Sequence, residues 1–500
     1  MEAYPVESCE GAFGSSRARF ETVVAWLAGT EAAGVPHAEL EQRLEQDSRR
    51  LFRQLLQDHL DLRAQREVRL REVVDAGETA RGSAEAGHTR GLATVFGAVT
   101  VQRIAYRSRG HANLHPADGV LNLPAERHSH GLRRLAALES ACGSFEQAVD
   151  AAERATGQRL GKRQVQDLAQ RAAVDVEGFY AQQQPGPSPP GDVLVVSCDG
   201  KGVVMRPEAL REPTRKQAGN TSHKLAARLS KGEKRNRKRM AEVGCVYDAT
   251  PRPRTSADIL PAGDRPGTPG PAARGKWLTA SVTADAANVI AAVFDEATRR
   301  DPGHRRAWVA LVDGNTHQLE RIGAEARARE VNVTVVVDFI HVLEYLWKAA
   351  WCFFAEGDRA AEAWVAGHAQ AVLAGHASRV AGAIRRKATY HGLGPGQRKN
   401  ADTAATYLRN KRRYLDYPTA LGYGWPIATG VIEGACRHLV KDRMDLTGAR
   451  WGLAGAEAIL KLRAVRSNGD FEAYWAYHLA QEQQRVHKAR YANGAIPLAA

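Results

Sequence analysis

Four carboxylates stand at positions where a side chain can do chemistry. Asp313 follows the apolar run of ALVDGN, and Asp338 follows that of VVVDFIH. Asp199 lies within VLVVSCDGKGVVM, and Glu433 lies in the first turn of a helix expected in TGVIEGACRHLVKDRM. Ligands of open α/β sheets bind outside the carboxyl ends of the strands, so acids at these ends come close together in space. Carboxylates without cysteine or clustered histidine suit magnesium or manganese rather than zinc.

Each acid also has a purely structural interpretation. The Asp-Gly pairs at Asp199 and Asp313 are turn signals, and Asp199 lies between two β-branched runs, as in a hairpin. Asp338 fits the cap of the following helix, and Glu433 fits the positive end of a helix dipole. The four acids together favour a metal site. Two ions held by carboxylates activate the attacking oxygen and stabilise the leaving oxygen of a phosphodiester.

Composition narrows the class of protein. The 500-residue chain has a formal net charge of +14, which favours polyanionic partners such as nucleic acid. Together with the acids, this charge predicts a nuclease or a strand-transfer enzyme.

The six cysteines are scattered without a C-x-x-C pair, so neither a zinc knuckle nor a disulfide framework is expected. No secretory signal or membrane-spanning run is recognisable, and we expect a cytoplasmic protein.

Alternating strand and helix patterns would position two of these acids. The pattern predicts a strand over 308–312, a helix over about 317–329 and a strand over 333–337. Such a unit implies parallel strands joined by a right-handed crossover. A further strand and helix are expected within 277–300. Residues 342–417 show no strand signal, and we expect them to be helical.

A Pro-, Gly- and Ser-rich segment at residues 182–192 predicts the main domain boundary. Before it, residues 38–74 repeat Leu and Phe at helical spacing, which predicts one or two amphipathic helices and leaves a homotypic interface open. After it, the stretch from Arg211 to Met240 contains eleven Lys or Arg and two Glu. This irregular stretch is either a solvated surface or a surface that follows phosphates.

The region before the linker has two recognisable patterns. HTRGLATVFGAVTVQRIAYRSR predicts a β-hairpin around Phe96 and Gly97. Further on, a helix, a break at Gly157 and a second helix beginning with Lys162 and Arg163 have the layout of a helix-turn-helix. Helix pairs with a glycine in the turn are common in any helical domain. DNA binding is therefore only slightly favoured over plain packing.

Four motifs, taken in order, resemble one known family: CDGKGVVMRPEALR, LVDGN, VVVDFIHVLEYLW and YGWPIATGVIEGACRHLVKDRMDLTGARW. Their order is similar to that in the ISKra family of bacterial insertion-sequence transposases, from about residue 85 to residue 478. Members of this family are DDE enzymes with a ribonuclease-H-like catalytic core. The resemblance implies an α+β multidomain fold. It would have a helical and hairpin N-terminal DNA-binding region, and a ribonuclease-H-like α/β catalytic core interrupted by an all-α insertion.

The resemblance also implies domain limits. We expect an N-terminal helical region at 1–84, a hairpin and helix-turn-helix-like DNA-binding region at 85–181, the linker at 182–192, a catalytic core at 193–341 and 425–482, and a helical insertion at 342–424. In such a core the first acid lies on the first strand. We expect that strand to run through Asp199 and to turn after Gly200 or Lys201.

Functional residues are carried over position by position. Asp199, Asp313 and Glu433 match the acidic triad, which would bind two Mg²⁺ or Mn²⁺ ions, with Asp199 bridging both. Asp338 and His341 match the D-x-x-H motif that follows the second acid, and they would contact DNA or order the site. The basic side chains expected to contact DNA are Lys162, Arg163, Lys234, Arg235, Lys238, Arg437, Lys441 and Arg443.

The activity implied by the resemblance is DNA transposition. Water would attack a phosphodiester at each element end, and the freed 3′-hydroxyl would then attack target DNA. The expected partners are double-stranded DNA, as terminal inverted repeats and as target, and further copies of the chain in at least a dimer. Residues 1–180 would bind the repeats and help to dimerise, near the nucleoid of a bacterial cytoplasm. Two alternatives stay open: a ribonuclease-H-like nuclease without strand transfer, and an inactive transposase-derived DNA-binding protein.

Overall fold

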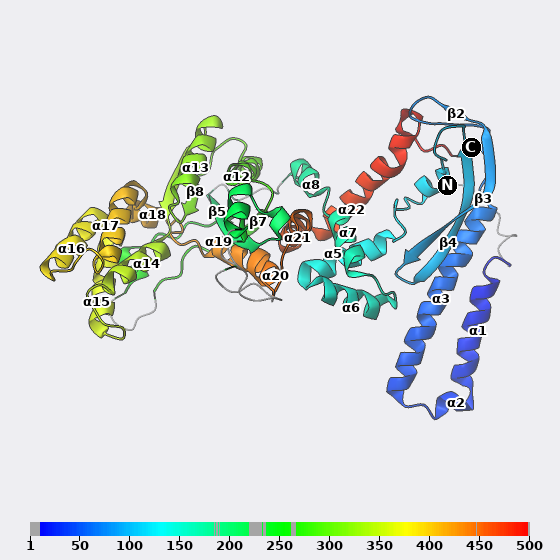
Figure 1. The fold of residues 1–500 in the computed structure, drawn as a ribbon, viewed down its shortest axis with the longest axis horizontal. Coiled ribbons are helices and arrows are strands. Elements are labelled where there is room, and N and C mark those ends of the chain that lie inside the picture. The colour runs from blue at the N-terminus through cyan, green and yellow to red at the C-terminus, as the bar shows by residue number, and fades with distance from the viewer. Residues whose placement is uncertain are drawn as a thin grey trace. The chain divides into compact units, whose positions relative to one another are not determined.

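The computed structural model describes residues 11–498 apart from 185, 187–188, 190, 220–232, 234–236, 262–266 and 447. Its contacts divide the chain into two compact units. The first unit is Met1–Ala181 with Asp470–Ala500, and the second unit is Gln182–Gly469. Figure 1 colours the first unit from blue to cyan, with its C-terminal part in red. The division after Ala181 falls at the start of the expected linker.

The first unit combines helices with a long hairpin. Its elements are α1 (Gly14–Ala28), α2 (Thr30–Ala33), α3 (His37–Gln65), β1 (Val73–Val74), β2 (Ala80–Arg81), β3 (Ser83–Thr94), β4 (Gly97–Arg107), α4 (Pro116–Val120), α5 (His130–Cys142), α6 (Phe145–Thr156), α7 (Lys162–Ala172) and α8 (Val176–Gln182). After the second unit, the chain adds α22 (Phe471–Glu482), the π-helical turn η5 (Gln483–His487) and the short turns η6 (Lys488–Arg490) and η7 (Ala492–Gly494).

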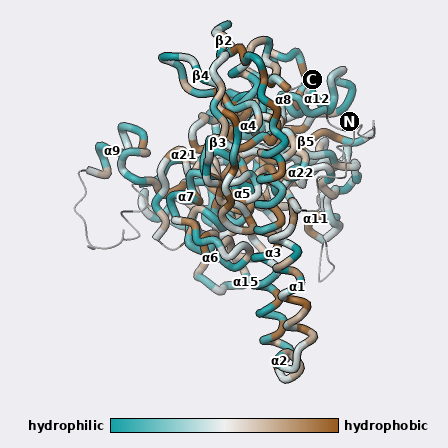
Figure 2. The backbone as a smooth tube through the Cα atoms, turned by 90° about the vertical axis from the view of Figure 1, so that its right-hand side faces the viewer, coloured by the Kyte–Doolittle hydropathy of each residue, from teal (hydrophilic) through white to brown (hydrophobic). Residues whose placement is uncertain are grey.

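Helices α1 and α3 leave part of their apolar surface exposed. Helix α3 is one continuous helix, but it ends at Gln65, before the limit of the expected amphipathic stretch at residue 74. Figure 2 shows hydrophobic residues along the α1–α3 region. The exposed apolar side chains of these helices are Phe20, Val24, Leu27, Phe52 and Leu55, which are 36–52% exposed. A homotypic interface on this surface stays a prediction.

The expected β-hairpin is confirmed. Strands β3 and β4 pair in antiparallel fashion up to the pair Thr94–Gly97, which flanks the turn. Apolar residues alternate with polar ones along β4, so Val99 and Val101 point to one face and pack against Leu60 of α3. This packing ties the hairpin to the long helix.

The pair of helices on either side of Gly157 is also confirmed. A capping box formed by Ser144 and Gln147 begins α6, and Gly157 ends it with a φ of 68°. Helices α5, α6 and α7 share one apolar core, made of Ala136, Ala148, Val149, Ala152, Leu160, Val165 and Leu168. DNA binding by this three-helix arrangement stays a prediction.

A buried ionic network connects α22 to the N-terminal helices. The guanidinium of Arg133, 1% exposed, donates to Glu482 at 2.7 Å and lies 3.0 Å from Nε2 of His478. His478 Nδ1 lies 2.7 Å from a carboxylate oxygen of Asp175, which also accepts from Arg485. Residues 470–482 were expected to complete the catalytic core. They belong to the first unit instead, because these paired charges are buried there.

The network predicts acid lability of the first unit. Burial acts to raise the pKa of Asp175, but hydrogen bonds from His478 and Arg485 outweigh it and lower the pKa to about 2. A carboxyl with a depressed pKa stabilises the fold above its unfolded pKa of about 3.9, and this contribution disappears as the pH falls towards 2. Asp175→Ala should lower the free energy of unfolding of the first unit by about 3 kcal/mol at pH 7.

Urea denaturation followed by hydrogen exchange of α22 peptides measures this loss. A matched control is Glu472→Ala on the same helix, whose ion pair with Arg134 is largely exposed and should contribute less than about 1 kcal/mol. Equal losses in the two variants would show that the buried network does not stabilise this unit.

The second unit has a central sheet, short connecting elements and many helices. Its strands are β5 (Val193–Val204), β6 (Lys238–Ala249), β7 (Ala273–Ser281), β8 (Trp308–Val312) and β9 (Val333–Val337). Its described helices are η2 (Pro207–Ala209), α9 (Glu212–Gly219), α11 (Ser256–Ile259), α12 (Ala286–Arg300), α13 (Thr316–Ala328), α14 (Phe339–Ala350), α15 (Arg359–Leu373), α16 (Ala377–Tyr390), α17 (Lys399–Lys411), η3 (Arg412–Tyr414), α18 (Tyr417–Gly422), α19 (Gly430–Ala435), the π-helix η4 (Cys436–Lys441), α20 (Asp442–Met444) and α21 (Leu453–Ser467).

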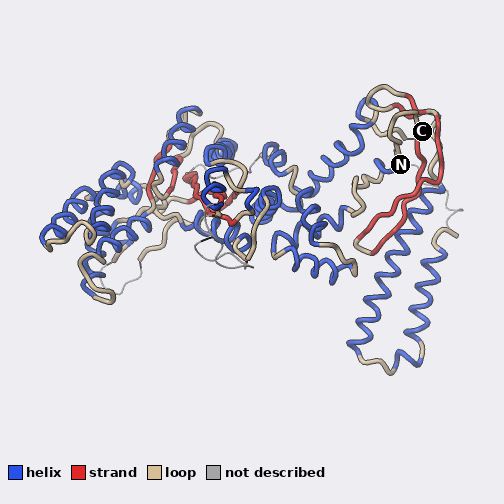
Figure 3. Tube along the Cα trace, in the orientation of Figure 1, coloured by secondary structure: helices blue, strands red, loops and turns tan. Residues whose placement is uncertain are grey.

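The sheet has the strand order β7-β6-β5-β8-β9. Strands β5, β6 and β7 are antiparallel neighbours, whereas β8 and β9 add in parallel, with the pairs Val196–Ala310 and Val312–Val337. The predicted limits of β8 and β9 are confirmed: β8 is buried along its whole length, and β9 forms the edge of the sheet beside it. Figure 3 shows these strands in red among the helices of this unit.

The expected turn after Asp199 is wrong. Strand β5 does run through Asp199, but it continues to Val204 and pairs with β6 over its whole length. The sequence analysis assigned the start of β6 to an irregular basic stretch. Its partner positions on β5 include Gly200 and Gly202, against which Met240 and Lys238 pack so closely that an added Cβ would collide. Pairing with a distant strand therefore overrides the local Asp-Gly turn signal.

Helices cover both faces of the sheet. Gly244 of β6 allows a close approach of α12, because a Cβ there would lie 2.4 Å from a methyl group of Val293. Side chains alternate along a strand, so Val243 and its partner Asp199 face the other side. On that side Asp199 contacts Cys436, at the junction of α19 and η4.

Residues 342–417 are helical, as predicted, and form α14 to α18 with short connections. The mixture of helical and sheet elements in two units confirms the coarse class of an α+β multidomain protein. Among the described residues, no helix combines the length and the apolarity that crossing a membrane requires.

Candidate active site

The register of the parallel strands aligns three acids. The β5–β8 pairing, continued by three residues, brings Asp199 level with Asp313. The β8–β9 pairing, continued by one residue, brings Asp313 level with Asp338. Asp313 and Asp338 directly follow their strands, as the sequence analysis expected. The three residues are therefore level across neighbouring strands, with Asp199 inside β5 and the other two just past the carboxyl ends of β8 and β9.

Asp338 is the most constrained of the three. It is fully buried and caps α14 by accepting from Ile340 N at 3.0 Å. It also accepts from Thr429 N at 3.2 Å and Oγ1 at 2.7 Å, and lies 3.3 Å from Nδ1 of His341. Burial acts to raise the pKa of Asp338, but the hydrogen bonds from His341 and Thr429 outweigh it and lower the pKa. The helix-cap interpretation of Asp338 is thus confirmed.

His341 is electrostatically tied to the acids. Its hydrogen bond to Asp338 raises its pKa, partial burial opposes this rise, and the charges of Asp338 and Asp313 add to it. The side chain is 34% exposed, so one edge of the ring faces solvent. Because ionised Asp338 favours the imidazolium, His341 keeps its proton to higher pH than an isolated histidine does.

Glu433 reaches Asp338 through a shared hydroxyl. Glu433 is exposed in the first turn of α19, as predicted, and Thr429 precedes that helix. The hydroxyl of Thr429 lies 2.7 Å from Asp338 and 2.9 Å from Oε1 of Glu433, and its one proton serves one carboxylate at a time. Among the described residues, Asp338, His341 and Glu433 place ligand atoms within 4.8 Å of one another, close enough to share one metal ion.

Asp313 lies in a tight turn beside the insertion. Its carboxylate accepts from Asn315 N at 2.8 Å, and its main-chain carbonyl accepts from the hydroxyl of Tyr407 at 2.9 Å. Gly314 has a φ of 88°, and a Cβ there would lie 3.2 Å from that hydroxyl. Helix α17 of the insertion thus holds the backbone of the second expected triad residue.

Asp199 contacts the helix that carries Glu433. One carboxylate oxygen accepts from Gly200 N at 2.6 Å, and the other accepts from the thiol of Cys436 at 3.3 Å. Burial and the charge of Asp199 raise the pKa of this thiol, so it stays protonated as a donor. Cys436 lies three residues after Glu433, about one helical turn further along. Its contact with Asp199 therefore links the first expected triad residue to the helix that carries the third.

Some contributors were missed by sequence reasoning. Glu242 of β6 pairs with Gly200, next to Asp199, but its side chain points to the other face of the sheet; burial and the charge of Asp199 raise the pKa of Glu242. No signal indicated it, since β6 itself was not predicted. Thr429 was detectable, because a Thr four residues before a Glu at a helix start can reach that carboxylate. The sequence analysis singled out neither residue.

The expected DNA-contacting residues near Glu433 separate into two groups. Arg437 and Lys441 are exposed. Arg443 differs from the expectation, because its side chain is buried and its guanidinium lies over the ring of Trp451, 4.7 Å from the centroid. It contributes to packing here rather than to a DNA-facing surface.

The remaining expected DNA contacts lie elsewhere in the chain. Lys238 is exposed at the start of β6, whereas Lys234 and Arg235 lie outside the described residues. In the first unit, Lys162 and Arg163 are exposed at the start of α7, where Lys162 forms a 2.7 Å ion pair with an exposed glutamate of α6. Their DNA contacts stay predictions.

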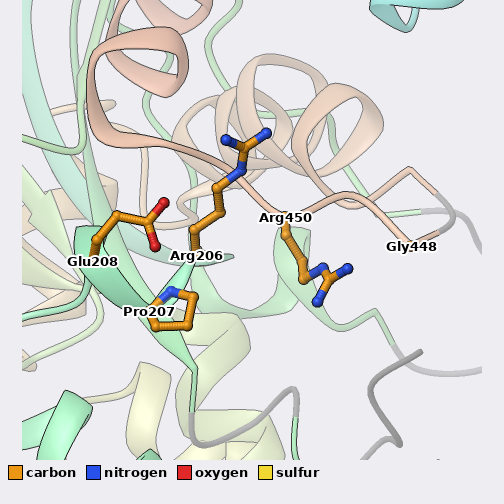
Figure 4. Close-up of a pocket in the computed structure, with 5 residues that line it drawn as sticks. All are labelled: Arg206, Pro207, Glu208, Gly448 and Arg450. Atoms are coloured by element: carbon orange, nitrogen blue, oxygen red, sulfur yellow. The ribbon is translucent and has the colours of Figure 1, made fainter. Parts of the chain in front are cut away.

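A separate cavity of about 510 Å³ lies in the second unit between the segment after β5 and the segment before α21. A hydrogen bond from Arg206 N to Trp451 O, 2.8 Å long, joins the two segments. In Figure 4 the side chains of Arg206 and Arg450 extend in different directions, with Glu208 beside Arg206. Two cations and one carboxylate give this cavity a weakly basic lining, without the carboxylate cluster of the acidic site.

The cluster of Asp338, His341 and Glu433 selects no single metal, because carboxylate oxygens suit Mg²⁺ and Mn²⁺ whereas an imidazole suits zinc and other transition metals. Of the expected triad, this ligand cluster contains Glu433 and lacks Asp199 and Asp313. No family model matches the chain, and no curated protein matches it either. Function is therefore inferred from the acids, their register and the surrounding charges.

The Asp338–His341 pair predicts a measurable titration. In NMR of ¹⁵N-histidine-labelled protein, the pKa of His341 should lie above the usual value of about 6.5. Asp338→Asn should lower it, because the imidazolium loses its ionised partner. Added Mg²⁺ should lower it as well, since a bound cation repels the imidazolium.

His341→Gln identifies the resonance and serves as its control. The ion pair stabilises the fold fully below about pH 6.5, and this contribution is lost as the pH rises through the raised pKa of His341. A His341 pKa that responds neither to Asp338→Asn nor to Mg²⁺ would contradict both the ion pair and a nearby metal.

Proposed function

We propose that the second unit is the catalytic core of a DDE transposase, which cuts and joins DNA with divalent metal ions. The observation that carries this proposal is the level arrangement of Asp199, Asp313 and Asp338 on three neighbouring strands. Glu433 completes the arrangement from α19, through the hydroxyl of Thr429. Such a convergence of acids is the donor set that phosphodiester chemistry with metal ions requires.

The sheet supports a ribonuclease-H-like core. The first acid lies on the first strand of the unit, and that strand pairs in antiparallel fashion with the next one. The second acid follows a strand that pairs in parallel with the first. A run of helices, α14 to α18, then separates these acids from Glu433. This sequence of elements agrees with the all-α insertion that the resemblance implies.

The residues divide into ligands and positioning groups. Asp199, Asp313 and Glu433 would hold Mg²⁺ or Mn²⁺, because each has carboxylate oxygens with few protein donors. Bound metal lowers the pKa of water and stabilises the leaving oxygen. Asp338 is fully buried and has two hydrogen-bond partners at each oxygen, so we assign it to positioning Thr429 and His341. Protonated His341 would face a DNA phosphate from the edge of the site.

The first unit would recognise the DNA ends. The three-helix arrangement of α5, α6 and α7 exposes Lys162 and Arg163 at the start of its last helix. Exposed apolar residues on α1 and α3 would join copies of the chain. Such an enzyme would act on terminal inverted repeats and target DNA in a bacterial cytoplasm.

Cleavage of DNA carrying the element's ends tests the proposal. With Mg²⁺ the wild-type protein should nick at the ends and form joined donor–target products. Asp313→Asn should lower the cleavage rate by at least about 100-fold, because metal stabilisation of the reacting oxygens contributes several kcal/mol. Binding of the same DNA should stay within about twofold of wild type.

The matched control is Asp295→Asn, an exposed aspartate of α12 paired with Arg329, which should cleave normally. Cleavage without joined products would favour a nuclease that lacks strand transfer. Binding without cleavage under Mg²⁺ and Mn²⁺ would favour an inactive DNA-binding relative. If Asp313→Asn cleaves like Asp295→Asn, the triad is not catalytic.

A further inference from the structure

The helical insertion carries a concentrated positive charge. From Ala377 to Tyr414, covering α16, α17 and η3, the chain contains ten Lys or Arg and one acid, Asp402. Asp402 is shared by Arg398 at 2.8 Å and Arg385 at 4.0 Å. Most of the other cations of this stretch have no carboxylate partner among the described residues. The whole chain has a net charge of +14, so this short stretch accounts for most of the excess.

Part of this charge lines a groove. A cavity of about 770 Å³ lies between α13 on one side and α17 with η3 on the other. We call it the basic groove. Its polar and charged lining includes Thr316, Arg327, Thr403, Asn410, Lys411 and Arg413. One acid, Glu320, is also part of the lining.

The basic groove adjoins the acidic site. Tyr407 lines the groove and donates its hydroxyl to the carbonyl of Asp313 at 2.9 Å. Its ring stacks on Tyr345 of α14, with centroids 4.0 Å apart. Lys411 donates to the hydroxyl of Thr316 at 3.0 Å, and Thr316 is the first residue of α13, three positions after Asp313. A DNA strand that passes from the acids towards α13 would therefore lie beside Lys411.

We propose that the basic groove binds the phosphate backbone of double-stranded DNA next to the bond that is cut. This inference rests on the proposed function of the acidic site and extends it to the path of the substrate. Charge complementarity selects the occupant. A mononucleotide would need a few donors, whereas α16 and α17 expose further cations, among them Arg386, Lys399 and Arg409, which a polyanion could also contact. Figure 1 shows these helices as one yellow cluster beside α13.

The phosphate contacts predict a defined salt dependence. Lys411→Gln combined with Arg413→Gln should weaken binding of a 40-base-pair duplex roughly 10-fold near 0.15 M salt. The slope of log affinity against log salt should shrink by about two, because each lost phosphate contact removes about 0.9. Fluorescence anisotropy without divalent metal measures both quantities, independently of cleavage.

Two further variants separate charge from structure. Lys411→Arg keeps the charge and should bind DNA like wild type. Arg359→Gln removes an exposed cation from the start of α15, outside the groove, and should leave the slope unchanged. The inference is overturned if the double variant keeps the wild-type slope, or if single-stranded RNA rather than duplex DNA shows the loss.

The outcomes also distinguish this inference from the proposed function. If the double variant loses duplex binding while wild type never cleaves, the groove binds DNA and the catalytic proposal fails. If wild type cleaves and the double variant binds and cleaves normally, the enzyme stands and the groove proposal fails. If wild type binds no duplex at all, both fail.

Discussion

The parallel hydrogen-bonded register of β5, β8 and β9 determines where the acids of the second unit lie. A slip of one residue in either pairing would turn the side chains of that strand to the opposite face and separate the carboxylates. Both faces of β8 are buried, so a slip of this strand would disrupt the close packing of its side chains against its neighbours. The site therefore depends on packing some distance from the chemistry. Asp338 adds a second constraint, because its buried charge is tolerated only while Thr429 and His341 donate to it.

Elements formed by local pattern could be predicted from the sequence. Strands β8 and β9 follow from runs of apolar, mostly β-branched residues, and the break at Gly157 follows from a glycine that ends α6 with a positive φ. Strand β6 could not be predicted, because its first residues, Lys238 to Met240, are charged or exposed and gain strand structure only by pairing with β5. For the same reason the turn expected after Asp199 was wrong. An Asp-Gly pair is a local turn signal, whereas the strand that pairs with β5 begins 39 residues after Asp199, at Lys238.

The acidic site was predicted in part. The three aspartates and Glu433 were recognisable by type and by their places at strand and helix ends. Their connections were not recognisable, because they depend on hydrogen bonds across the fold. The Thr429 hydroxyl between two carboxylates and the Cys436 thiol on Asp199 are of this kind. For Arg443 the sequence analysis expected a contact that the structure does not support. Its guanidinium packs on Trp451 instead of facing solvent.

The return of the chain to the first unit has a consequence for biosynthesis. Arg133 is synthesised together with its partner Glu126, long before its other partners, His478 and Glu482. Domains generally fold as units during synthesis, N-terminal parts first. Here the second unit, Gln182–Gly469, is contiguous in sequence and can fold before α22 is synthesised. The N-terminal helices of the first unit lack α22 until then. A chain truncated before Phe471 would therefore have a complete sheet unit and an unfinished first unit, in which Arg133 keeps its ion pair with Glu126 but loses His478 and Glu482.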